Sequence, residues 1–102
     1  MRIVNKALVR EFVAQATHCE WCHKKGPVEA HHLWAKGHGG GHRLDVLINL
    51  IALCRQDHQA HHDGNEPTRS DLVAVVAARE KMLQDDLVAE ITRLRNLPKG
   101  GL

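Results

Sequence analysis

The residue types that can do chemistry are concentrated in the middle of this 102-residue chain. All nine histidines and all three cysteines lie between His18 and His62, and neither type occurs elsewhere. Imidazole nitrogens and thiolate sulfurs are the usual protein ligands of zinc and related divalent ions. The middle segment, residues 18–64, is therefore where a metal centre is expected.

The spacing of the cysteines predicts a zinc site. Cys19 and Cys22 are separated by two residues, and Cys54 and Asp57 repeat that spacing with a carboxylate in place of the second sulfur. Zinc binds such ligands in a closed tetrahedral site, which adds the folding free energy that a small core lacks. A redox-active cysteine pair would need a βαβ context, which the sequence does not indicate.

The fourth zinc ligand has two candidates. If a helix begins near Arg55, Asp57 and His61 are four residues apart and lie on the same helical face. Either side chain could complete the site that the three cysteines begin, and spacing alone does not choose between them.

A second group of ligands consists of imidazoles. His58 and His62 are four residues apart on the same predicted helix, so both rings project to one side and can hold a single divalent ion. His31, from a preceding strand, can add a third nitrogen. Three protein ligands leave coordination positions open for water and phosphate, which is typical of a catalytic metal site. The alternative is a solvated, histidine-rich helix face, which the nearby His32 and Asn49 make the weaker interpretation.

Two extended segments and a helix must position these side chains. The stretch "PVEAHHLW" is bounded by turn residues and predicts a strand, in which His31 and His32 point to opposite faces. "GHGGG" predicts a loop, and the apolar "VLINLIALC" predicts a buried strand or an extended turn. A helix then begins near Arg55, carries "RQDHQAHH" and ends before Gly64.

Helices are predicted on both sides of this segment. Apolar residues at helical spacing predict a short amphipathic helix within residues 1–17. After the linker "NEPTRSD", Thr68 or Ser70 can cap a helix that has Asp71 in its first turn. An apolar stripe then continues to about Asn96, and a break in it is expected near Gln84.

Composition limits the classes of function. With 43% hydrophobic residues and a net charge of +2, the chain fits one compact domain that can, but need not, bind nucleic acid. Only 3% of the residues are aromatic, so base stacking is not the main means of recognition. The odd number of cysteines indicates a reducing compartment, and the N-terminal residues resemble neither a signal peptide nor a membrane span. A cytoplasmic location is expected.

Four motifs together resemble the HNH endonuclease family, the ββα-metal nucleases, over about residues 19–64. They are "CEWC", "HH" before a glycine-rich loop, "NLIALC" and "DHQAHHDG". The likeness is to small phage-type HNH proteins that carry a zinc-binding cysteine pair. It implies an α+β fold with a small ββα-metal, treble-clef-like core that zinc holds together. The whole chain, 1–102, would then be one nuclease domain, with an N-terminal helix (1–17), the core (18–64) and a C-terminal helical extension (65–102).

The resemblance also implies a role for each candidate side chain. His32 would be the general base, and Asn49 would position it through its ring or through the backbone of its loop. A catalytic Mg²⁺, Mn²⁺, Ni²⁺ or Zn²⁺ ion would be held by His31, His58 and His62. A structural Zn²⁺ would be held by Cys19, Cys22, Cys54 and Asp57, the last standing where the family usually has cysteine. The basic residues that could contact the phosphates of nucleic acid are Lys36, Arg43 and Arg55.

The function that the resemblance implies is metal-dependent hydrolysis of DNA phosphodiester bonds. One catalytic motif cuts one strand, so a monomer would nick DNA and a homodimer could cut both strands. Phage packaging or recombination proteins are candidate partners, in the cytoplasm of a host cell if a phage encodes the protein. The alternative is a non-catalytic zinc-binding module for nucleic acid or protein on the same fold, which would not need His32 together with the His58 and His62 pair.

Overall fold

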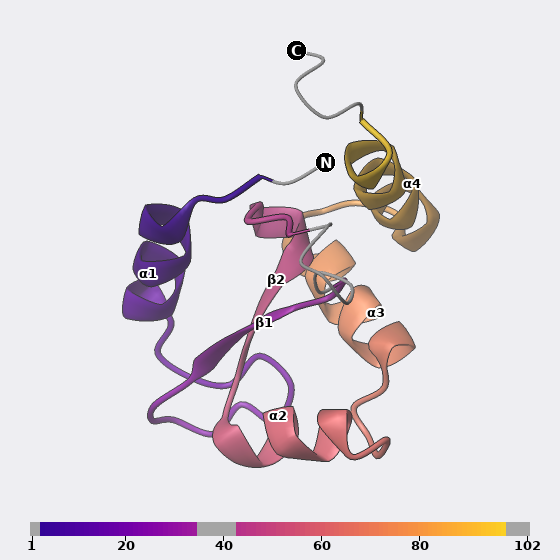
Figure 1. Cartoon of the computed structure of the whole chain (residues 1–102). Coiled ribbons are helices and arrows are strands. Elements are labelled where there is room, and N and C mark those ends of the chain that lie inside the picture. The colour runs from indigo at the N-terminus through magenta and orange to yellow at the C-terminus, as the bar shows by residue number, and fades with distance from the viewer. Residues whose placement is uncertain (1–2, 35–42, 98–102) are drawn as a thin grey trace.

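A small antiparallel sheet and the helices around it make up the structure, a computed structural model that describes residues 3–34 and 43–97 (Figure 1). In chain order the elements are α1 (Lys6–Gln15), β1 (Glu29–His32), the short 3₁₀ helix η1 (Leu47–Asn49), β2 (Leu50–Leu53), α2 (Arg55–His62), α3 (Arg69–Arg79) and α4 (Gln84–Arg95). The mixture of helices with a small sheet agrees with the predicted α+β class. The succession β1, β2, α2 is compatible with a ββα arrangement.

The two strands place the neighbouring histidines on different faces of the sheet. β1 and β2 pair antiparallel, with His31 opposite Ile51 and His32 opposite Leu50. Successive side chains of a strand point to opposite sides, and accordingly His31 is buried while His32 is half-buried. β2 is buried along its whole length, as its unbroken apolar sequence predicts.

The hydrophobic core lies between β2 and the two C-terminal helices. In Figure 1, α1 lies to the left of the sheet and α3 to its right. The largest apolar side chains of the core are Leu33, Leu44, Ile51, Leu53, Leu72, Val76, Leu87 and Ile91. Burying a side chain of this size stabilises the fold by roughly 1.5–3 kcal/mol. The core thereby fixes β2 and, with it, the point at which α2 begins.

The C-terminal apolar stripe is divided between two helices, as the sequence predicts. Of the two candidate caps, Thr68 is the one used: its hydroxyl accepts from the Asp71 N–H at 3.2 Å, and the Asp71 carboxylate accepts from the Thr68 N–H at 2.9 Å. α3 ends at Arg79, Lys81 adopts a φ of 57°, and α4 begins at Gln84. A non-glycine residue with positive φ interrupts a right-handed helix, so the chain turns before Gln84.

The N-terminal helix is shorter than residues 1–17 because a cap sets its start. The Asn5 side chain accepts a hydrogen bond from the Leu8 N–H at 3.0 Å, and α1 follows directly. Before the cap, Ile3 forms a parallel bridge with Leu44, which ties the start of the described chain to the segment that leads into β2. Within residues 3–34 and 43–97, no helix has the length and hydropathy of a membrane span.

Candidate functional site

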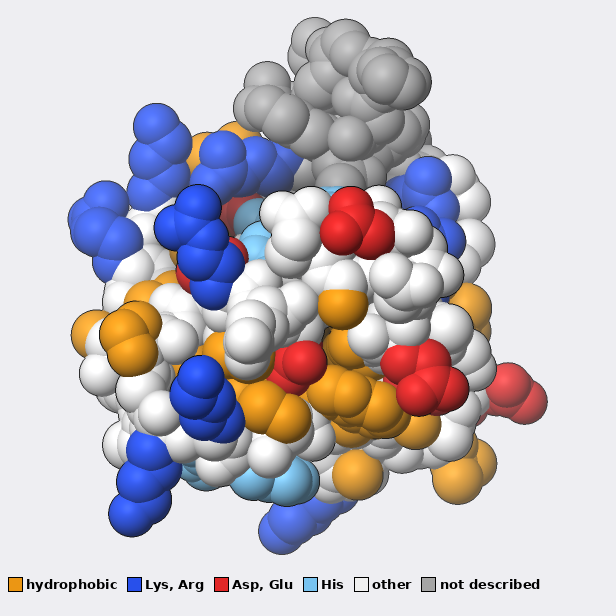
Figure 2. Space-filling model, turned by 90° about the horizontal axis from the view of Figure 1, so that it is seen from below, with side chains coloured by type: hydrophobic (Ala, Val, Ile, Leu, Met, Phe, Trp, Pro, Cys, Tyr) orange, Lys and Arg blue, Asp and Glu red, His pale blue; other side chains and the backbone are white. Residues whose placement is uncertain are grey.

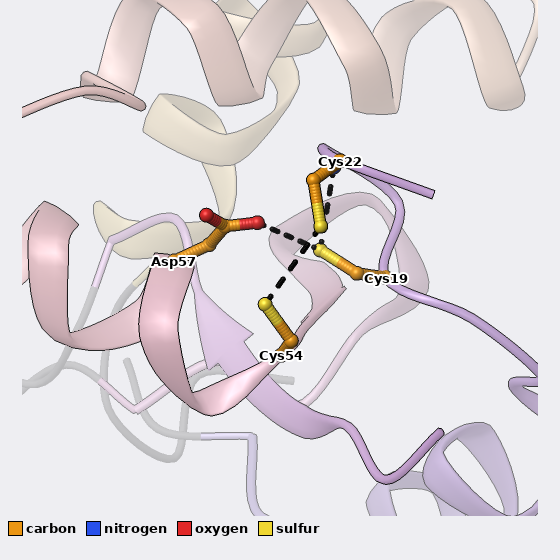
Figure 3. A group of neighbouring side chains, drawn as sticks. All are labelled: Cys19, Cys22, Cys54 and Asp57. Atoms are coloured by element: carbon orange, nitrogen blue, oxygen red, sulfur yellow. Dashed lines mark hydrogen bonds between the residues drawn. The ribbon is translucent and has the colours of Figure 1, made fainter. Parts of the chain in front are cut away.

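A first group of ligand side chains joins the turn after α1 to the start of α2 (Figure 3). Cys19 and Cys22 come from the turn, Cys54 is the N-cap residue of α2, and Asp57 lies in the first turn of that helix. Their four ligand atoms all lie within 4.8 Å of one another. The three cysteines thus meet as their spacing predicts, together with Asp57, one of the two candidates for the fourth ligand.

The distances within this group fit a tetrahedral zinc ion. Cys22 Sγ and Cys54 Sγ are 3.8 Å apart. Two sulfurs bound to zinc at about 2.3 Å in a tetrahedral arrangement also lie about 3.8 Å apart. Cys19 Sγ is 3.2 Å from Asp57 Oδ2, so the carboxylate belongs to the same group. The group could therefore hold a metal ion, and its donor atoms and sulfur spacing suit zinc.

Position favours Asp57 over His61 as the fourth member of this group. The ring of His61 turns elsewhere, because its Nδ1–H donates to the Pro67 carbonyl at 2.7 Å. The same ring packs edge-on against His31, with ring centroids 4.6 Å apart. His61 therefore belongs with the imidazoles described below rather than with the cysteines.

Two thiols of this group, those of Cys22 and Cys54, have raised pKa values that favour the protonated form. Hydrogen bonding to Asp57 raises the pKa of Cys22 to about 12, and burial raises the pKa of Cys54. Burial works toward a higher pKa for Asp57 as well, but hydrogen bonds from Cys22 and Cys19 outweigh it and lower that pKa. Because metals bind thiolates, an ion that binds here must displace these protons, and its affinity is expected to rise with pH.

The second group consists of three imidazoles from β1 and α2. One ring nitrogen each of His31, His58 and His62 lies within 4.8 Å of the others. His31 Nδ1 and His58 Nε2 are 3.2 Å apart. Two nitrogens bound to one zinc ion at about 2.0–2.1 Å in a tetrahedral arrangement lie about 3.3 Å apart. The spacing of these nitrogens therefore fits two ligands of a single ion.

His31 has the charge state that metal binding requires. Burial, followed by the repulsion of the neighbouring imidazoles His61, His58 and His62, lowers the pKa of His31 to about 3. The ring is thus neutral at physiological pH, and neutral imidazole is the form that binds metals. Its Nε2 is buried and has no hydrogen-bond partner among the residues that the structure describes.

Glu29 orients one of these ligands and was not singled out from the sequence. Its Oε1 is 2.9 Å from His58 Nδ1, so the carboxylate accepts a hydrogen bond from the Nδ1–H of that ring. Nε2 of His58 is then free to face His31. A carboxylate that fixes the tautomer of a ligating histidine in this way is common at metal sites. The sequence feature that could have indicated Glu29 is its position two residues before His31, which places both side chains on the same side of a strand.

His32 turns to the other side of β1, where a buried carboxylate meets it. Its Nε2 is 2.8 Å from Asp45 Oδ1, and the side chain of Asp45 is 0% exposed. Burial works toward a higher pKa for Asp45, but the hydrogen bonds from Arg43 and His32 outweigh it and lower the pKa to about 2. Asp45 was also missed from the sequence. The signal for it is an acidic residue that directly precedes the apolar run "VLINLIAL".

Asn49 acts on the backbone around His32 rather than on its ring. It is fully buried, its Oδ1 accepts from the Trp34 N–H at 2.9 Å, and its Nδ2 donates to the carbonyls of Trp34 and Leu44, both at 3.1 Å. Trp34 and Leu44 lie on either side of residues 35–42. Of the two contacts considered for Asn49, the one with the loop backbone is therefore formed.

Two of the three basic residues proposed for phosphate contacts, Arg43 and Arg55, lie among the described residues. Arg43 donates from Nε to Asp45 at 3.0 Å and 3.1 Å, and Arg55 is exposed at the start of α2. Lys36 lies outside the described residues. In Figure 2, most of the visible Lys and Arg side chains lie on the left half of the face, and others lie at its lower edge and upper right. A phosphate-binding role for these three residues stays a prediction.

The family comparison agrees with the site. A family model described as HNH endonuclease matches residues 19–64, and this confirms the resemblance on which the assignment of roles depends. The matched segment runs from Cys19 to two residues beyond His62, so it contains both groups of ligand side chains. No curated protein and no solved structure matches the chain. HNH nucleases use a divalent metal and act on DNA, and the match over residues 19–64 suggests nuclease-type activity for this chain.

Proposed function

We propose that this protein is a metal-dependent endonuclease that hydrolyses phosphodiester bonds in DNA. The observation that carries the proposal is the meeting of nitrogens of His31, His58 and His62 within 4.8 Å. His32 adjoins them on β1 but faces the other way. A purely structural metal site has no need of a further imidazole beside three ligating ones. The match of residues 19–64 to a nuclease family supports the same conclusion.

His32 would serve as the general base. Imidazole accepts protons near neutral pH, and a positioned general base accelerates a reaction by about 10²–10⁴-fold. The side chain of His32 is 23% exposed, which leaves it accessible to water and substrate. It would take a proton from water as the water oxygen attacks phosphorus and the bond to the 3′ oxygen breaks. The products would carry 5′-phosphate and 3′-hydroxyl ends.

His31, His58 and His62 would hold the divalent ion, for which Mg²⁺, Mn²⁺, Ni²⁺ and Zn²⁺ are candidates. When bound, the ion would supply positive charge that stabilises the charge developing on the phosphate and the leaving oxygen. Glu29 would keep the His58 ring turned toward the other two ligands. The three cysteines and Asp57 would hold a structural zinc ion, which would fasten the start of α2 and so help to place His58 and His62.

One such site in each chain would cut one DNA strand at a time. A monomer would therefore produce nicks, whereas a homodimer could cut both strands. Association with phage packaging or recombination proteins would be a separate property, which the resemblance suggests and the described residues do not specify.

A plasmid nicking assay tests the proposal. The protein is incubated with supercoiled DNA and Mg²⁺, Mn²⁺, Ni²⁺ or Zn²⁺, and formation of open circles is followed beside the variant His32→Ala. We expect wild-type protein to nick DNA only with an added ion, and His32→Ala to be slower by about 100-fold or more. His18→Ala is the matched control, because His18 is exposed and lies outside both ligand groups. It should nick at the wild-type rate.

The metal content distinguishes loss of the base from loss of the fold. Both variants should keep about one zinc ion per chain, as a closed structural site predicts. Wild-type protein that binds DNA but nicks it with none of the four ions would overturn the proposal. That result would instead support a non-catalytic zinc-binding module.

A further inference from the structure

The carboxylate of Asp45 is held by several hydrogen bonds beside the proposed site. It is fully buried and lies 2.8 Å from His32 Nε2. Two other donors hold it: Arg43 Nε at 3.0 Å and 3.1 Å from its oxygens, and the backbone N–H of Asn5 at 2.7 Å. In a buried location water does not compete for these hydrogen bonds, so they constrain the geometry strongly.

The two oxygens of Asp45 have different partners. Oδ1 faces His32, whereas Oδ2 accepts from the backbone N–H of Asn5. Arg43 Nε lies between them and contacts both oxygens. The backbone around this pair is fixed as well, because Ile3 N–H donates to the Arg43 carbonyl at 2.7 Å and the Asp45 N–H donates to the Ile3 carbonyl at 2.8 Å. Residues outside the family match thus determine where the carboxylate lies.

We infer that Asp45 is a positioning residue for His32, and this inference rests on the proposed function of His32 as the base. The ionised carboxylate accepts a hydrogen bond from Nε2–H, which leaves Nδ1 as the unprotonated nitrogen of the neutral ring. Nδ1 takes the proton from water, and the imidazolium that results is stabilised by the same carboxylate, which keeps its charge. The proton leaves Nδ1 for solvent or for the 3′ oxygen after the bond breaks.

Replacing Asp45 with asparagine should reverse this arrangement. The Asn5 N–H can only donate, so the single amide oxygen of the variant is best placed at the Oδ2 position. The amide NH₂ then faces His32 and donates to Nε2, which moves the ring proton to Nδ1 and blocks the atom that should accept a proton. In serine-protease triads the corresponding change lowers kcat by about 10⁴ because the histidine adopts the wrong tautomer.

The tautomer of His32 can be measured without relying on catalysis. Long-range ¹H–¹⁵N correlation spectra of the full-length protein distinguish the two neutral forms, and His32→Gln identifies the signals of that ring. We expect the Nε2–H tautomer in wild-type protein and the Nδ1–H tautomer in Asp45→Asn. An Nδ1–H tautomer in wild-type protein would overturn the inference, even if Asp45→Asn does not fold.

Nicking rates supply the second measurement. We expect Asp45→Asn to lower kcat on the order of 10³–10⁴-fold, with little change in KM for DNA. The matched control is Asp86→Asn, which makes the same isosteric change at an exposed site on α4 and should leave the rate unchanged. A folded Asp45→Asn that nicks as fast as wild type would refute the role of Asp45. Wild-type protein that does not nick would refute the proposed nuclease function instead, while the tautomer measurement would still decide on Asp45.

Discussion

The surroundings of single side chains distinguish the two neighbouring histidines of β1. His31 and His32 are adjacent, yet one turns into a cluster of imidazoles and the other toward a buried carboxylate. An acidic side chain also contacts a histidine on each side: Glu29 contacts His58 of the imidazole cluster, and Asp45 contacts His32. Under the proposed function, the two carboxylates would separate a metal-ligand role from a general-base role, although histidine performs both.

Glu29 should strengthen metal binding through His58. Removing a side chain that hydrogen-bonds the other ring nitrogen of a ligating histidine usually lowers the affinity for the metal by about 10–100-fold. Because the Glu29 side chain is 49% exposed, we expect the lower end of that range, about tenfold, for Glu29→Ala. Calorimetric titration with Mn²⁺ or Ni²⁺ measures the effect. Glu66→Ala, at an exposed position beyond α2, is the control, and equal affinities in the two variants would contradict the role given to Glu29.

Asp45 should also make the free energy of unfolding depend on pH. Its folded-state pKa of about 2 lies below the ordinary value of 3.8, so folding favours the ionised form. The corresponding stabilisation, on the order of 2 kcal/mol, is present above about pH 4 and is lost as the pH falls through about 2. The unfolding free energies of wild type and Asp45→Asn, measured in denaturant, should therefore converge in acid. A difference between the two unfolding free energies that stays constant from about pH 6 to about pH 2 would argue against the lowered pKa of Asp45.

At the scale of elements, the sequence is most informative where contacts are local. The start of α2 after Cys54, the strand with "EAHH" and the interruption before Gln84 all follow from spacing, turn residues and capping within a few positions. The three cysteines of the first group could be predicted for the same reason, because Cys19 with Cys22 and Cys54 with Asp57 have the same spacing. These features need no knowledge of how distant segments pack.

Contacts between distant segments could not be predicted in this way. Asp45 meets His32 across 13 residues and meets the Asn5 N–H across 40 residues. No periodicity links such positions, because their meeting depends on the bridge between Ile3 and Leu44 and on the burial of the core. For the same reason spacing left Asp57 and His61 as equal candidates, and only the direction of each side chain separates them.

The cap of α3 gives a prediction at this scale. Thr68→Ala removes the hydroxyl that accepts from the Asp71 N–H, and loss of such a cap costs about 1 kcal/mol. Ser70→Ala changes the other candidate cap, which lies inside α3, and should have a much smaller effect. The stabilities of the two variants are compared by thermal unfolding, which is monitored by circular dichroism. Equal losses of stability would show that the hydroxyl of Thr68 does not cap the helix.

At the scale of the whole molecule, the cysteine group joins the turn after α1 to the start of α2 at the border of the hydrophobic core. Cys19 and Cys54 belong to that core, which lies mainly between β2, α3 and α4, and Cys22 and Asp57 complete the group beside it. Small domains often depend on such a metal link for stability.

Removing zinc should therefore lower the stability of the chain. We expect treatment with a strong chelator to lower the unfolding temperature, and added zinc to restore it. Cys22→Ser, which lacks one of the ligands, should be less stable from the start and should respond less to the chelator. Circular dichroism with a parallel measurement of bound zinc checks both expectations. An unfolding temperature that is the same with and without bound zinc would be the contrary result.

The bridge between Ile3 and Leu44 has a consequence for anyone who wishes to transplant this activity. The stretch that the family pattern covers begins only at Cys19, but the amide that anchors Asp45 belongs to Asn5. Under the proposed function, a minimal unit excised at the pattern's borders would keep every proposed ligand and lose the anchor of Asp45. We therefore expect the leading residues to be needed for cleavage of DNA as well.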